Sequence, residues 1–119
     1  MINKAMIVGR LGADPESKFT QGGKMVTTFR VATDRHWKDG DGQSVKETEW
    51  HTIAVWERLA ELCQQYLQKG SLVFVEGRLQ TRSWDDKEHE GVKHYRTEIV
   101  AGEVKFLDRA GTNGATAEE

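Results

Sequence analysis

The sequence lacks several features that mark other classes of protein. It has one cysteine, Cys63, in 119 residues, which excludes an internal disulfide framework and any zinc site built from several cysteines. We expect Cys63 to be a small buried apolar residue. No window approaches the ~18 apolar residues of a membrane span, and the N-terminal segment has no apolar signal-peptide core. We therefore expect a soluble intracellular protein with no membrane partner.

The net charge is small, and recognisable catalytic motifs are absent. Seventeen Lys and Arg against 19 Asp and Glu give a net charge of -2, so bulk charge does not point to nucleic acid. There is no glycine-rich phosphate loop, and no Ser or Cys nucleophile has a recognisable partner, so we predict that the chain is not an enzyme. His89 and His94 flank a charged loop, which we interpret as a solvated hairpin rather than a metal site. We expect no cofactor and no metal.

The residue pattern predicts strands and a single helix in one domain. Alternating and β-branched residues predict strands over residues 3–11, 25–34, 45–56, 72–84 and 92–107, with a continuation of the first over 17–20 and a bulge at Gly102. Residues 57–69 change to helical spacing, and Gly70 follows them. Three strands, one helix and two strands is the order of the OB-fold, a five-stranded Greek-key barrel. We predict this all-β fold with one helix for residues 1–107, and a flexible tail for residues 108–119.

The four tryptophans point to the function. Side chains alternate across a strand, so Trp50 and Trp56 lie opposite the aliphatic residues of their strand, and so does Trp84 in the next strand. Trp37 opens the loop after the second predicted strand, and several arginines share the tryptophan faces. Exposed indoles can stack on unpaired bases while Arg and Lys neutralise phosphates, which suits single strands. The alternative is that these indoles are buried in the core or in a subunit interface.

Several segments resemble the bacterial single-stranded DNA-binding protein family over residues 3–107. The matching strings are NKAMIVGRLGADPE at 3–16, FRVAT at 29–33, TEWH at 48–51, LAEL at 59–62, YLQKGS at 66–71, VEGRLQTRSW at 75–84 and YRTEIV at 95–100. The resemblance implies an OB-fold homotetramer that binds single-stranded DNA without sequence preference in replication, recombination and repair. It also implies a cytoplasmic, nucleoid-associated location.

The resemblance assigns roles to individual residues. It implies stacking by Trp37, Trp50, Trp56 and Trp84, phosphate contacts by Lys4, Arg10, Lys38, Arg58, Lys69 and Arg82, and a subunit contact by His51. Family members usually end in an acidic tip that recruits replication and repair proteins. This sequence ends at Ala117-Glu118-Glu119 without that tip, so we do not expect the recruitment to carry over. Two alternatives stay open: a primosomal or RNA-binding OB module, and a structural subunit that binds a protein through its tryptophan face.

Overall fold

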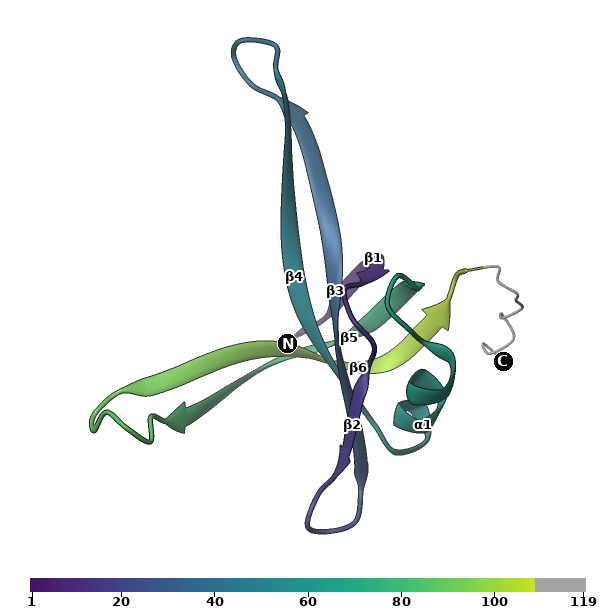
Figure 1. The fold of residues 1–119 in the computed structure, drawn as a ribbon, viewed down its shortest axis with the longest axis vertical. Helices are drawn as coiled ribbons and strands as arrows, with labels where there is room; N and C mark the ends of the chain where they lie inside the picture. The colour runs from purple at the N-terminus through teal and green to yellow at the C-terminus, as the bar shows by residue number, and fades with distance from the viewer. Residues whose placement is uncertain (109–119) are drawn as a thin grey trace.

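The computed structural model describes residues 1–108, which form six strands and one helix (Figure 1). The elements are β1 (Ala5–Leu11), β2 (Glu16–Phe19), β3 (Met25–Lys38), β4 (Ser44–Trp56), α1 (Glu57–Tyr66), β5 (Leu72–Asp85) and β6 (Lys93–Phe106). The sheet order is β1-β5-β6-β4-β3-β2, and β1 also pairs with β3, so the sheet closes on itself. This is the predicted OB-fold, with the helix between β4 and β5. No helix within residues 1–108 is long and apolar enough to cross a membrane.

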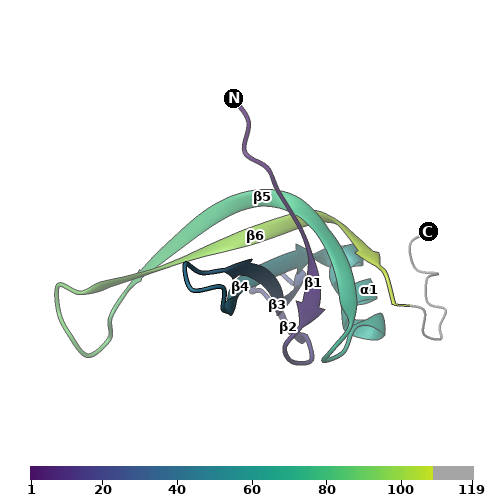
Figure 2. The ribbon, with the colours of Figure 1, turned by 90° about the horizontal axis from the view of Figure 1, so that it is seen from above.

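Two long hairpins leave the barrel in different directions. Figure 1 shows the β3–β4 hairpin and the β5–β6 hairpin projecting far beyond the closed part of the sheet, with α1 away from both tips, and Figure 2 shows the β5–β6 hairpin from above. The β3–β4 ladder continues through Trp37↔Val45 to Lys38↔Ser44. Trp37 therefore lies in β3, and the prediction that it opens a loop was wrong. These exposed polar ends have no buried face, so they carry little alternation from which a strand can be predicted.

Other boundaries also differ from the predictions. The helix ends at Tyr66, not Lys69, because Leu67 adopts an extended backbone (φ -96°, ψ 151°). The amide of Lys69 instead donates a hydrogen bond to Asp14 Oδ1 at 2.8 Å. In place of the predicted continuation over 17–20, β2 is a separate strand that pairs with β3. The predicted bulge is confirmed, because the β5–β6 register skips Gly102.

The barrel interior is aliphatic. Val31, Ile53, Val55, Val73 and Val75 are completely buried, as their alternation predicts. The helix adds Ala60 and Cys63 to this core. Burial raises the pKa of the Cys63 thiol to about 12, so it is an inert thiol, in agreement with its expected packing role. Residues facing outward along the same strands are consequently free to form a binding surface.

The predicted C-terminal tail begins at Asp108. Residues 109–119 lie outside the described part of the chain. Asp108, its first residue, accepts a hydrogen bond from the Leu72 amide at 2.9 Å, and its other oxygen lies 3.5 Å from Arg10 Nη1. The chain therefore leaves the barrel beside the start of β5.

The junction between β4 and α1 yields a test of the fold. Glu57 has φ 58°, a left-handed conformation that costs a residue with a Cβ atom ~1–2 kcal/mol. Glycine avoids this cost but is more flexible when unfolded, so Glu57→Gly should stabilise the protein by up to ~1 kcal/mol. Thermal unfolding measures the gain. The control is Gln65→Gly in the same helix, which should destabilise by ~1 kcal/mol. Equal losses of stability in both variants would contradict the left-handed backbone conformation of Glu57.

Candidate nucleic-acid interface

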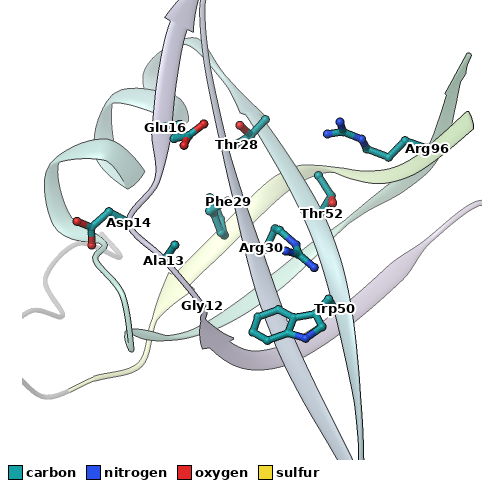
Figure 3. Close-up of a pocket in the computed structure, with 10 residues that line it drawn as sticks. All are labelled: Gly12, Ala13, Asp14, Glu16, Thr28, Phe29, Arg30, Trp50, Thr52 and Arg96. Carbon is teal, nitrogen blue, oxygen red and sulfur yellow. The ribbon is translucent and has the colours of Figure 1, made fainter. Parts of the chain in front are cut away.

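Trp50 lies against the backbone of the β1–β2 loop and forms one wall of a pocket. A Cβ atom on Gly12 would lie 2.5 Å from the indole, so only glycine allows this contact without a shift. Arg30 from β3 places its guanidinium carbon 5.0 Å from the ring centroid. The indole is still 45% exposed and lines a pocket of about 410 Å³ (Figure 3). Thr28, Thr52 and Arg96 line the same pocket.

Trp84 and Trp37 repeat the pairing of an exposed indole with an arginine. Trp84 on β5 is 45% exposed, with Arg96 5.8 Å from its ring centroid. Trp37 near the end of β3 is 39% exposed, with Arg35 at 4.3 Å. A guanidinium over an aromatic face is attracted by the ring quadrupole, so each contact orients both groups. The predicted outward parity of Trp50 and Trp84 agrees with these exposures.

Trp56 is less accessible than the other three tryptophans. It is half-buried and pairs with Val26 across β3 and β4. It lines a second groove, of about 670 Å³, together with Trp84, Phe19 and Arg82. Trp56 and Trp84 therefore face one continuous groove although they come from different strands.

The predicted phosphate contacts are scattered, and most of them are already paired. Of the predicted set, only Arg82 lines either of the two described pockets. Lys38 and Lys69 have no ion-pair partner within residues 1–108. The other four residues of the set have partners. Lys4 pairs with Glu76 at 2.8 Å, Arg58 with Glu61 at 2.9 Å and Arg82 with Glu98 at 3.0 Å. Arg10 donates a hydrogen bond to Gly70 O at 2.9 Å and lies 3.5 Å from Asp108.

The ion pairs of Lys4, Arg10 and Arg58 would compete only weakly with phosphate binding. Lys4, Arg10 and Arg58 are well exposed, and exposed pairs contribute only ~0–1 kcal/mol. The hydrogen bond to Glu76 raises the pKa of Lys4, which keeps its ammonium charged. A phosphate could therefore replace any of these carboxylates at small cost.

The sequence predictions missed the arginines that lie closest to the indoles. Arg30, Arg35 and Arg96 were not among the predicted site residues. Alternation places Arg30 on an outward face, but only the register Ala32↔Trp50 brings it beside the indole. Arg96 reaches the pockets because it pairs directly with Arg82 across the β5–β6 hairpin.

His51 and His94 each form a side-chain hydrogen bond, in different parts of the structure. His51 is half-buried, shares a face with the core residue Val31, and its Nε2 lies 2.9 Å from Thr33 Oγ1. At the β5–β6 tip, Asp86 Oδ2 lies 2.9 Å from His94 Nε2, and this hydrogen bond lowers the pKa of Asp86. The His94 ring stacks on Trp84 with centroids 5.6 Å apart. No group of three or more potential metal ligands is present within the described residues.

A closed OB barrel with indoles and guanidinium groups on its outer surface defines an oligonucleotide-binding class of protein. Comparison with known proteins gives the particular family. A profile of the single-strand binding protein family matches residues 2–107, and the chain belongs to that family. The predicted family resemblance is thus confirmed.

Relatives and solved structures agree with this assignment. The chain is 46% identical to single-stranded DNA-binding protein 1 of Chlorobaculum tepidum, covering 98% of this chain and 72% of the relative. It is 44% identical to the single-stranded DNA-binding protein of Neisseria meningitidis serogroup A, covering 99% and 68%. The Plasmodium falciparum SSB complex with ssDNA superposes with TM-score 0.82 at 36% identity, covering 91% of this chain and 96% of that one. A deletion mutant of the Thermus aquaticus single-stranded DNA binding protein superposes with TM-score 0.77 at 30% identity, covering 93% and 53%.

The contact between Gly12 and Trp50 can be tested by a double-mutant cycle. Gly12→Ala places a methyl group where the indole lies, so it should move the ring, shift its emission and destabilise the protein by ~1–3 kcal/mol. The destabilisation should disappear in a Trp50→Ala background, because the methyl group then has room. Fluorescence spectra measure the emission shift, and thermal unfolding measures the destabilisation. Gly40→Ala is the control, since nothing lies within 4 Å of that position. An equal cost of Gly12→Ala in both backgrounds would show that the indole is not the obstacle.

Proposed function

We propose that this protein binds single-stranded DNA without sequence preference and without catalysis, by stacking bases on tryptophan and contacting phosphates with Arg and Lys. One observation carries the proposal: within residues 1–108, every exposed tryptophan has an arginine 4.3–5.8 Å from its ring. Each such pair offers an aromatic face and a cation to a single nucleotide unit. Stacking contributes ~1–3 kcal/mol per base and tolerates any base.

The surface favours an unpaired strand over a duplex. Bases in a duplex stack on one another and do not offer their faces to a protein side chain. The indoles here project from three strands, β3, β4 and β5, which suits a flexible strand that follows the surface. Membership of the family, and the likeness to a Plasmodium falciparum protein in complex with ssDNA, support the same ligand.

The proposed path uses more cations than the sequence resemblance assigned. Arg30, Arg35 and Arg96 contact the indoles and would meet phosphates beside stacked bases. Lys38 and Arg82 extend this set, and Lys4, Arg10, Arg58 and Lys69 would contact DNA that continues around the barrel. By binding only unpaired DNA, the protein would melt hairpins through mass action and protect the strand in replication, recombination and repair.

We also propose that the chain forms a homotetramer. Met6 and Val8 on β1 are 59% and 53% exposed, and β1 pairs with β3 only at Arg10 and Leu11. An exposed apolar strand with a largely unpaired edge is a template for pairing with a second copy. Leu79, which is 47% exposed, and the half-buried His51 offer further contacts. Several copies of the binding path on one particle would increase avidity for a long strand.

A fluorescence titration with oligo-dT tests the binding mode. Stacked bases should quench several indoles at once, and Trp50→Ala should weaken binding by ~1–3 kcal/mol with little change in folding. Trp50→Phe is the matched control, because it keeps an aromatic face and should lose less affinity. Absence of quenching would favour the structural-subunit alternative. Tighter binding of oligo-rU than of oligo-dT would favour the RNA-binding alternative.

Light scattering tests the assembly. The wild type should have a mass near four times 13.5 kDa. Val8→Lys introduces a charge into the exposed face of β1 and should reduce the mass. Val92→Lys is the control, since Val92 is 43% exposed but lies at the β5–β6 tip. A monomeric wild type would refute the tetramer without affecting the stacking proposal.

A further inference from the structure

A buried carboxylate lies beneath the tryptophan groove. Glu98 on β6 is 5% exposed and lines the groove that contains Trp56 and Trp84. Arg82 Nε donates a hydrogen bond to Glu98 Oε1 at 3.0 Å, and Arg96 Nη1 lies 3.9 Å from Oε2. One carboxylate therefore holds two guanidinium groups, which come from different strands.

This arrangement brings together charges that would otherwise separate. Arg82 and Arg96 are directly paired across β5 and β6, and like charges in directly opposite positions repel. Glu98 offsets that repulsion, and the arginines in turn compensate its buried charge. Two guanidinium charges minus one carboxylate charge leave about one positive charge facing the groove.

The arginines keep donors available for a ligand. Arg82 contacts Glu98 through Nε, so its terminal nitrogens have no hydrogen-bond partner within residues 1–108. The Arg82 and Arg96 side chains are 49% and 53% exposed. Guanidinium groups donate paired hydrogen bonds that match the oxygens of a phosphate.

The position of Arg96 indicates that the backbone of a bound strand, rather than a base, would contact it. Arg96 lines both the Trp50 pocket and the Trp56–Trp84 groove. Figure 3 shows its side chain extending from β6 toward the β3–β4 side of the Trp50 pocket. A strand with one base on Trp50 and a later base on Trp84 must pass its backbone between the two sites.

We propose that Arg82 and Arg96, held together by Glu98, form a binding site for one phosphodiester group of single-stranded DNA at the crossing between the Trp50 pocket and the Trp56–Trp84 groove. This inference rests on the proposed function. It assigns both arginines, which the proposed path already includes, to the same phosphate and gives Glu98 the role of holding them there. The glutamate is a positioning residue and does not contact the DNA.

The salt dependence of oligo-dT binding tests whether the phosphate is shared. Each phosphate neutralised on a single strand contributes ~0.7 to the slope of log K against log salt. Arg82→Ala and Arg96→Ala should each reduce the slope by up to ~0.7, and the double variant should lose no more than ~0.7 in total. A loss near twice that value in the double variant would assign the arginines to separate phosphates and overturn the proposal. An unchanged slope in all three variants would overturn it as well.

Matched controls separate charge, folding and function. Lys105→Ala removes one positive charge from β6, the strand that also carries Arg96. Lys105 lines neither pocket, so this variant should leave the slope nearly unchanged. Removing both arginines leaves Glu98 buried without a partner, which can prevent folding. A second set of arginine variants is therefore made in a Glu98→Gln background, where the Gln oxygen can still accept the Arg82 hydrogen bond and the double variant leaves no buried charge unpaired. The slope loss of the double variant should again stay within ~0.7.

The proposed function and this inference fail in different ways. If wild-type protein shows neither oligo-dT binding nor quenching, the proposed function is wrong, and the shared site is wrong with it. If the wild type binds and Trp50→Ala weakens binding, but the slope losses of the arginine variants add, only the shared phosphate is refuted.

Discussion

Closure of the sheet is the constraint on which the other features depend. β1 pairs with β5 along most of its length and reaches β3 at Arg10 and Leu11, while β4 pairs in parallel with β6. Once the barrel is closed, each strand has an inner face that packs and an outer face that does not. Two glycines permit this close approach, because a Cβ atom on Gly9 would meet the backbone of Ala32, and one on Gly77 would meet the backbone of Val100. The outer face is then available for aromatic and charged residues.

The proposed binding surface combines this outer face with two hairpins that project beyond the barrel. Far from the core, side chains on these hairpins are held by neighbours on the same strand or on the paired strand rather than by burial. Arg35 lies over Trp37, and His94 stacks on Trp84. Such contacts orient exposed rings at a cost smaller than that of burying them. A protein with net charge -2 can therefore expose cations beside its indoles, although several of them, such as Arg35 and Arg82, are paired with carboxylates.

Much of the fold followed from local patterns, and the errors have physical causes. Alternation around Ile53 and Val55 placed Trp50 outward, and the change to helical spacing at Glu57 located the helix. The helix ends earlier than predicted because Leu67 stays apolar and buried after its backbone becomes extended, so hydrophobic spacing continues without a helix. The prediction that the second strand ends before Trp37 was wrong, because an exposed hairpin has no buried face and its residues need not alternate between apolar and polar.

The sequence by itself determined which residues of a strand share a face, because side-chain parity depends only on the extended backbone. It also determined the order of the elements and the family, and it supplied the tryptophans. Only the tertiary structure decided which residues meet across strands. Arg30 reaches Trp50, and Glu98 joins Arg82 to Arg96, because strand register and barrel closure bring distant segments together. Register depends on pairing between whole strands, so no local pattern contains it.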